Sequence, residues 1–242
     1  MISKCMKKTI LASSLLYIST NLVAAPQYYG VLEMGLSHSD FSNLEASTPE
    51  VSTTTEVVDD SGNSSFFSVG VGINWENSPL RSEIVYSSYG EQNFIEDTVF
   101  SSSTGFSNER TTTNIKQDSL MFNLLYDIDI KSNVFKPYIG AGVGVLRSKV
   151  SATQSDEPAT SRSASFAETS DTNFMWSVVV GANYSVAETL KVGFGYRYMD
   201  AGEISTDDNC VGSPSAICDA GETHSADQKS QLLFVSMNYY FE

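Results

Sequence analysis

Histidine is the side chain best suited to acid–base chemistry near neutral pH, and this chain contains two, His38 and His224. His38 follows Ser37 and precedes Asp40 by two positions, so the residue types of a serine-hydrolase triad stand together. The chain is so rich in serine and aspartate that such a grouping is expected by chance. The sequence has no phosphate-binding glycine loop, metalloprotease helix motif or catalytic Cys/His pair. We therefore predict that the protein is not an enzyme, has no catalytic residues and binds no cofactor.

Cysteine is the second residue type with distinctive chemistry. Cys5 precedes an apolar N-terminal segment, whereas Cys210 and Cys218 stand eight positions apart near the C-terminus. Cys5 belongs to the N-terminal segment that we expect to be removed on export, so two cysteines remain in the mature chain. An even number of cysteines in an exported chain favours a disulfide. A metal-binding pair is the alternative, but this spacing, without nearby His or Cys partners, matches zinc sites poorly. We predict a Cys210–Cys218 disulfide and no metal site.

The first 25 residues have the pattern of a secretory signal peptide. Lys4, Lys7 and Lys8 form a basic start, residues 9–23 are uncharged and mostly apolar, and Ala24 and Ala25 are small. The apolar part is shorter than the ~20 residues that a membrane-spanning helix needs. We predict export of the chain and removal of residues 1–25, with cleavage after Ala24 or Ala25.

The chain is strongly acidic. Three of the 14 basic residues and none of the 29 acidic residues lie in the signal segment, so the mature chain has a net charge of −18. This balance argues against nucleic acid as a partner. Twenty of the acidic residues lie in four segments, 38–64, 91–114, 150–172 and 201–227, whose basic residues are Arg110 and Arg162.

Large apolar side chains alternate with small or polar ones along much of the chain. Every second residue is apolar from Phe67 to Trp75, and the alternation is nearly complete from Leu190 to Tyr198. Because successive strand residues point to opposite faces, each such segment predicts a strand with one apolar face. We expect eight strands: 27–37, 65–76, 80–90, 115–128, 134–149, 173–186, 190–200 and 228–241.

Short and long connections alternate between these strands. Residues 77–79, 129–133 and 187–189 form short turns, while the four acidic segments form long loops. An even number of strands with this alternation is typical of bacterial transmembrane barrels. We predict an all-β fold for residues 26–242: an eight-stranded, antiparallel, up-and-down transmembrane β-barrel with short periplasmic turns and four long extracellular loops.

A soluble barrel with an apolar interior is the alternative, because it shows the same alternation. The other face of these strands carries mainly Gly, Ser and Asn, which suit a crowded interior better than a solvated surface. Aromatic residues gather near strand ends on the apolar face, as in the interfacial girdles of membrane barrels. The candidate interfacial aromatics are Trp75, Trp176, Tyr184, Tyr198 and Tyr239.

A few charged residues lie on the small-residue face. A charge facing lipid at the bilayer midplane costs ~2–4 kcal/mol, so we expect these side chains to point inward. Unpaired, they could line a narrow water path. Paired across the lumen, they would plug an eight-stranded barrel, whose interior is only wide enough for side chains. We predict the plugged arrangement, formed by a lumen charge network of Glu33, Arg81, Glu83, Lys191 and Arg197.

Several segments resemble a known family. Phe135 to Gly144, with the sequence FKPYIGAGVG, resembles a strand of the small outer-membrane β-barrel proteins, which include opacity proteins, the outer membrane protein A barrel and surface antigens. Val192 to Asp200 resembles the family's penultimate strand. Leu232 to Phe241 is similar to its C-terminal sorting strand, which implies that Tyr239 and Phe241 form an assembly signal for the barrel-assembly machinery. The family usually ends on the aromatic residue, whereas Glu242 follows Phe241 here.

The function implied is that of a cell outer membrane surface protein. Loops held by a rigid scaffold gather binding residues, so we expect the acidic loops to mediate adhesion or host contact. The expected partners are outer-membrane lipid and lipopolysaccharide, the barrel-assembly machinery and a host receptor or matrix protein, and we expect a monomer. The alternative is a narrow, porin-like channel for small solutes. A lipid A-modifying enzyme would need His38 or His224 beside a lipid-facing serine.

Overall fold

The computed structural model describes residues 26–47, 53–59, 61–75, 77–100, 108–132, 134–157, 163–205, 210–213 and 223–241. None of these residues belongs to a helix that could span a membrane. The predicted signal segment lies outside them and stays a prediction. The long strands are β1 (Gln27–Ser47), β3 (Ser61–Asn74), β4 (Leu80–Phe100), β5 (Asn108–Asp127), β6 (Phe135–Glu157), β7 (Ser163–Ser185), β8 (Leu190–Ser205) and β10 (Thr223–Tyr240). The short strands are β2 (Thr53–Asp59) and β9 (Cys210–Ser213).

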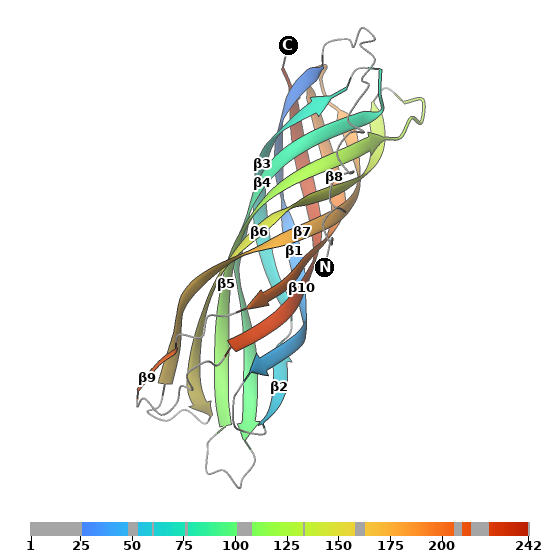
Figure 1. The fold of residues 1–242 in the computed structure, drawn as a ribbon. Helices are drawn as coiled ribbons and strands as arrows, with labels where there is room; N and C mark the ends of the chain where they lie inside the picture. The colour runs from blue at the N-terminus through green and yellow to red at the C-terminus, as the bar shows by residue number, and fades with distance from the viewer. Residues whose placement is uncertain are drawn as a thin grey trace, which may run out of the picture.

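The eight long strands form one antiparallel sheet that closes on itself (Figure 1). Each long strand pairs with the next one along the chain, and β10 completes the barrel by pairing with both β8 and β1. β2 continues the line of β3 against β4, and β9 pairs with the far end of β7. The predicted eight-stranded antiparallel barrel is confirmed.

At the end opposite the short turns, the strands run far beyond their predicted limits. β1 continues to Ser47 rather than residue 37, β4 to Phe100 rather than 90, and β6 to Glu157 rather than 149. The predicted loop bounds are therefore wrong, because much of each acidic segment is β-strand. The outer face of this part meets water, so the apolar alternation that marks the strands disappears while the backbone ladder continues. These long hairpins form the lower end of the barrel in Figure 1.

Large apolar side chains cover the outside of the rest of the barrel. Leu36, Val71 and Phe194 are 68%, 62% and 62% exposed, whereas the inward-facing Ser68 and Asn123 are buried. Monomeric soluble proteins rarely expose apolar patches of more than a few hundred Å². We call this outer surface of exposed apolar side chains, which includes Leu36, Val71 and Phe194, the lipid belt. The lipid belt faces a bilayer, and the soluble-barrel alternative is excluded.

Inside the barrel, two glycines make room for tyrosine rings on neighbouring strands. Tyr29 lies opposite Gly72 in the ladder, and Tyr138 lies opposite Gly181. A Cβ atom at Gly72 would overlap the Tyr29 ring, and one at Gly181 would overlap the Tyr138 hydroxyl. The small residues of the alternating pattern therefore decide where large side chains can cross the lumen.

We expect Gly72→Ala to lower the free energy of unfolding by ~1–3 kcal/mol, because the Tyr29 ring must move to admit the methyl group. Urea unfolding of the barrel in lipid vesicles measures this change. Gly30→Ala is the matched control, since the nearest atom to a Cβ there is a Phe241 ring carbon at 3.5 Å, an ordinary contact. Equal stability of the two variants would show that the space left by the missing side chain of Gly72 is not required by the Tyr29 ring.

Candidate functional site

The barrel interior is filled in layers, which can be followed along the inward-facing residues of β10. A charged and aromatic layer lies nearest the short turns and is followed by an apolar layer. An amide–hydroxyl layer and a second apolar layer come next toward the long hairpins. From the turn end, the inward residues that pass through these layers are Tyr240, Asn238, Ser236, Phe234, Leu232, Ser230, Gln228 and Ala226.

Arg81 is the centre of the charged layer and is only 1% exposed. Its Nη1 lies 3.2 Å from Glu83 Oε1, and its Nε donates to both carboxylate oxygens of Asp127 at 3.0 and 3.1 Å. Tyr29 Oη accepts a hydrogen bond from Arg81 Nη1 at 3.1 Å and donates one to Glu83 Oε1 at 2.7 Å. Burying a charge is tolerable only when it is paired and hydrogen-bonded, and this guanidinium has two carboxylates.

A second buried ion pair joins β8 to β1. Arg197 Nη1 and Nη2 donate to the two oxygens of Glu33 at 3.2 and 3.3 Å, in the bidentate arrangement that fixes both side chains. The cavity between this pair and the Arg81 cluster has a volume of about 10 Å³. That is about one probe sphere, the minimum that holds a single water molecule, so the charged layer leaves no room for a solute.

The structure places four of the five predicted lumen charges in these two ion pairs. Arg81 and Glu83 come from the same strand, whereas Arg197 reaches past β10 to Glu33 on β1. Sequence reasoning missed Asp127 and Tyr29, which complete the Arg81 cluster. Asp127 has the same inward parity as the buried Asn123, and this parity was the signal that could have found it.

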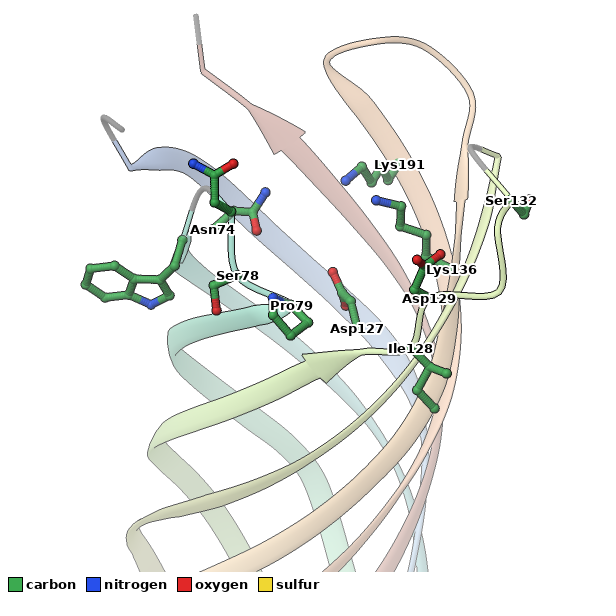
Figure 2. A pocket seen from close by; sticks show the side chains of 11 residues that line it. Asn74, Ser78, Pro79, Asp127, Ile128, Asp129, Ser132, Lys136 and Lys191 are labelled. Carbon is green, nitrogen blue, oxygen red and sulfur yellow. The ribbon is translucent and has the colours of Figure 1, made fainter. Parts of the chain in front are cut away.

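Lys191 lies outside both ion pairs. Its Nζ lies 4.1 Å from the centroid of the Tyr240 ring, and among the described residues it makes no ion pair. Lys191 lines a cavity of about 310 Å³ at the turn-side mouth, together with Lys136, Asp127 and Trp75. Figure 2 shows the side chains of Lys136 and Lys191 pointing into this cavity from the same wall. The cavity ends at the Arg81 cluster, whose Asp127 it shares.

The middle of the barrel is filled by apolar side chains. Three methionines contribute thioethers, which adapt to irregular gaps between strands. Tyr89 adds a ring that packs on Phe66 with centroids 5.8 Å apart. The apolar layer consists of Phe66, Tyr89, Met121, Leu125, Tyr138, Leu146, Met175, Val179, Met199, Ala201, Leu232 and Phe234.

Toward the long hairpins, a chain of hydrogen-bonded side chains crosses the lumen. Gln117 on β5 and Gln228 on β10 exchange two hydrogen bonds of 2.6 and 2.9 Å. Further bonds of 2.9 to 3.4 Å extend this pair to six strands. The amide–hydroxyl layer consists of Ser64, Gln92, Ser39, Ser230, Gln228, Gln117 and Ser148. A second apolar layer of Phe41, Ile115, Val150 and Ala226 follows it.

The residues of the possible triad lie on opposite sides of the wall. Ser37 is buried in the interior, while His38 points outward, with its Nε2 3.2 Å from Asp40 Oδ1. The three residues therefore do not assemble into a triad. Cys210 begins β9, but Cys218 lies outside the described residues, so the disulfide stays a prediction. His224 lies in β10, and its side chain is likewise outside the described part of the chain.

The candidate interfacial aromatics lie on the outer wall, on the same face as the lipid belt. Tyr198 packs against Trp176 with ring centroids 5.8 Å apart. Phe241 packs edge-on against Tyr239 at 5.7 Å, so both residues of the predicted assembly signal face outward. The placement of these side chains in membrane interfaces and in assembly stays a prediction. The outward aromatics are Trp75, Trp176, Tyr184, Tyr198 and Tyr239.

A closed barrel with a lipid belt and a filled lumen is characteristic of one group of bacterial proteins. The family described as "Outer membrane protein beta-barrel domain" matches residues 9–216. The chain belongs to this family. It is a bacterial outer-membrane protein, and the lipid belt is the part that the membrane surrounds. The chain is also 30% identical over 112 residues to outer membrane protein PagN of Salmonella typhimurium, which covers 46% of this chain and 42% of PagN. It thus spans less than half the length of that curated relative.

Solved structures share the fold. Neisserial surface protein A matches with a TM-score of 0.51 and 17% identity, over 88% of this chain and 97% of that structure. OprG from Pseudomonas aeruginosa matches with a TM-score of 0.50 and 16% identity, over 90% and 97%. The outer membrane protease OmpT from Escherichia coli matches with a TM-score of 0.52 and 12% identity, over 91% and 99%. At such identities the likeness concerns the fold alone.

We expect Arg197→Ala to lower the free energy of unfolding by ~3–5 kcal/mol, because Glu33 then keeps a buried charge without its partner. The double variant Glu33→Gln, Arg197→Met removes both charges and should recover most of this loss. Urea unfolding in lipid vesicles measures both variants. Lys229→Ala, on the outer wall, is the control, with an expected change below ~1 kcal/mol. A double variant no more stable than Arg197→Ala would contradict the role given to the ion pair.

Proposed function

We propose that this protein is an adhesin whose barrel holds an acidic extracellular end against host or environmental molecules. The observation that carries the proposal is the continuation of the strands past the lipid belt. On β6, the outward apolar residues end at Val145, and the strand continues for twelve residues to Glu157. At ~3.3 Å per residue and a tilt of ~40°, these residues rise ~30 Å. A wall of that height presents side chains well beyond the membrane surface.

The charge of the extracellular end limits the partners that suit it. The four acidic segments that form this end hold 20 of the 29 acidic residues. Some of these carboxylates are paired with lysines of the outer wall, as Glu91 is with Lys116 and Glu168 is with Lys149. The excess of carboxylates favours a basic or neutral partner over an anionic one.

A narrow channel is the second candidate, and the cavity at the turn-side mouth favours it. This cavity ends at the Arg81 cluster, and the Glu33–Arg197 pair lies beyond it. A solute would then have to displace the buried apolar layer and the hydrogen-bonded chain through Gln117 and Gln228. A filled lumen supports a scaffold rather than a conduit, because an eight-stranded interior is only wide enough for side chains.

We also propose that the chain has no catalytic role. His38 contacts Asp40 and Asn63 on the outer wall, while the adjacent Ser37 faces the lumen. Lipid A modification would need a histidine beside a lipid-facing serine, and His38 does not provide one in this arrangement. OmpT is a protease, but its likeness to this chain concerns the fold and does not extend to that activity.

The remaining partners follow from the location in the membrane. The lipid belt contacts outer-membrane lipid. We propose that the outer wall above it contacts lipopolysaccharide, and that Tyr239 and Phe241 are read by the barrel-assembly machinery. We further propose a monomer with a host receptor or matrix protein as its extracellular partner.

Shortening the four long hairpins should abolish adhesion. Deletion of residues 41–60, 93–114, 151–168 and 203–227 joins positions that face each other in the ladders, so a two-residue Asn-Gly turn can close each hairpin. We expect binding of a non-adherent laboratory bacterium to host cells and matrix proteins to fall to the vector level. A variant that keeps every hairpin but replaces its Asp and Glu by Asn and Gln separates charge from shape. A well-displayed full-length barrel that binds none of the targets would contradict the proposal.

Neither Arg197→Ala nor Gln117→Ala should open a conducting path in planar lipid bilayers. Each substitution shortens one side chain of one layer, and the remaining layers still fill the lumen. Single-channel current recordings at several hundred millivolts measure this, with a wide-pore porin as the positive control. Discrete current steps in either variant, absent from the parent, would show that a single layer closes the barrel and would favour the channel.

A further inference from the structure

Two lysines project into the turn-side mouth of the barrel. Lys136 on β6 lies opposite the buried Asn183 in the ladder, and Lys191 on β8 lies opposite the buried Asn238. Directly opposite residues of a ladder project from the same face of a sheet, so both lysines lie on the lumen side of the wall. Among the described residues neither lysine makes an ion pair. Two ammonium groups therefore enter the mouth without a carboxylate of their own.

The strand order brings the two lysines close together. Only β7 separates β6 from β8 in the sheet. Their ladder partners are joined across β8, where Asn238 Nδ2 donates to Asn183 Oδ1 at 3.3 Å. Gly193 lies between these asparagines, and a Cβ atom there would overlap Asn183 Oδ1. Figure 2 shows the side chains of Lys136 and Lys191 extending into the same cavity.

The electrostatic field at Lys191 is positive. The Tyr240 ring, whose centroid lies 4.1 Å from the Lys191 Nζ, covers one side of this ammonium group. The charges that act on it are, in order of strength, those of Arg81, Lys136 and Asp127. Each of the two cations acts more strongly than the carboxylate, so the position attracts an anion. Asp127 is also held by Arg81 Nε, which donates to both of its oxygens.

The rest of the lining suits a small polar ligand. The cavity has a volume of about 310 Å³, near the lower limit of the sizes of small-molecule sites. Asn74 lies across the mouth from the two lysines (Figure 2), and its side-chain amide can both donate and accept hydrogen bonds. Asp129 is the second carboxylate of the lining. It is exposed to solvent, and its Oδ1 accepts the N–H of Lys131 at 2.8 Å.

The paired lysines indicate what kind of anion fits. Two ammonium groups in one cavity repel each other, and a single compact group with two negative charges neutralises both. A phosphate monoester carries about −1.5 to −2 charges at pH 7 and has three strong acceptor oxygens, whereas a carboxylate carries one charge. Lysine suits phosphate because its ammonium is a compact charge with three donors.

We propose that the turn-side mouth binds a small phosphate monoester, with its phosphate between Lys136 and Lys191 and the remainder of the ligand against Asn74. In the predicted orientation this mouth opens to the periplasm. The site lies at the opposite end of the barrel from the long hairpins, so the inference goes beyond the proposed adhesin and does not depend on it. A lipid headgroup could supply the same phosphate, but the lumen side of the wall favours a soluble ligand.

The first test uses the full-length barrel in a detergent without phosphate and glycerol phosphate as the probe. We expect saturable binding, measured by phosphorus NMR line broadening. Dimethyl phosphate carries one negative charge and should bind roughly tenfold more weakly or less, because one ammonium then keeps its charge uncompensated. No saturable binding of glycerol phosphate, or equal binding of dimethyl phosphate, would overturn the proposal.

Variants of the barrel locate the site. Lys136→Gln and Lys191→Gln each remove a charged hydrogen-bond donor and should weaken binding by roughly tenfold, and the double variant should abolish it. Lys131→Gln is the matched control, since Lys131 is exposed at the same end of the barrel and does not line the cavity. Heat-modifiable gel mobility shows that each variant is folded. Unchanged binding in the folded double variant would place the ligand elsewhere and overturn the assignment.

Asp129→Asn tests the sign of the charge that the cavity recognises. The substitution removes a negative charge from the lining, so we expect it to strengthen the binding of glycerol phosphate severalfold. Weaker binding in this variant would show that the carboxylate contributes to the contact and would overturn an anion as the occupant.

Nanodiscs distinguish a soluble ligand from a lipid headgroup. The parent barrel is embedded in phosphatidylcholine alone or in phosphatidylcholine with phosphatidic acid, whose headgroup is a phosphate monoester. We expect glycerol phosphate to bind equally in both membranes. Loss of this binding in the membrane with phosphatidic acid would show that a lipid headgroup reaches the lysines, and it would overturn the soluble ligand while supporting the phosphate site.

Discussion

The absence of water inside a lipid bilayer is the constraint on which this structure depends. Each backbone N–H and C=O in the lipid belt must find a protein partner, and a sheet can meet that demand only by closing on itself. The closure between β1 and β10 meets it along the whole height of the belt. Where lipid ends, water can serve the backbone, and the wall changes character there. The strands lose their outward apolar residues, β8 has a bulge at Ala201 between Asp200 and Gly202, and the ladder between β7 and β8 is interrupted above Trp176 and Asp200.

Closing eight strands leaves an interior wide enough for side chains alone, and this barrel fills it with four layers in sequence. The charged layer is tolerable because Arg81 and Arg197 each have a carboxylate within hydrogen-bonding distance. Glycines opposite Tyr29 and Tyr138 provide the volume that their rings occupy. The neutral chain through Gln117 and Gln228 then ties together strands that do not neighbour each other. Side chains thereby fill the described part of the lumen, and the outer wall, the long hairpins and the turn-side mouth are the surfaces that remain accessible.

The fold could be predicted from the sequence because lipid imposes a strict alternation. Val71 or Phe194 is large because it faces acyl chains, and its neighbours are small because the lumen is crowded, so the strand order and number could be inferred. The strand ends could not be predicted, because the outer face meets water instead of lipid from about the predicted end of each strand, such as residue 37 of β1, onward. The inward Phe41 still packs there, but an outward polar residue no longer distinguishes strand from loop.

The candidate site was predictable only where charge marked it. Glu33, Arg81, Glu83 and Arg197 stood out because a charge on the small-residue face has no acceptable place except the lumen. Gln92 and Gln117 carry no such mark, and neither does the bulge at Ala201. The bulge arises where β8 pairs with β10 on one side and with β7 on the other. The alternation of residue types along one strand does not reveal how its two neighbours are paired. Parity groups Lys191 with the lumen charges, although its height along the barrel places it at the mouth.

The pairing of the first strand with the last has a kinetic consequence. The Ser39–Ser230 hydrogen bond joins residues 191 positions apart, and the rings of Tyr29 and Tyr240 stack at 4.8 Å across the same pair of strands. Contacts between such distant parts of a chain form slowly, because a large loop must close before they can contribute. Until β10 pairs, both β1 and β8 have an unpaired strand edge, and the lipid belt is not closed. The barrel therefore closes only when its C-terminal strand pairs, and until then the open sheet must be kept from aggregating with other copies of the chain.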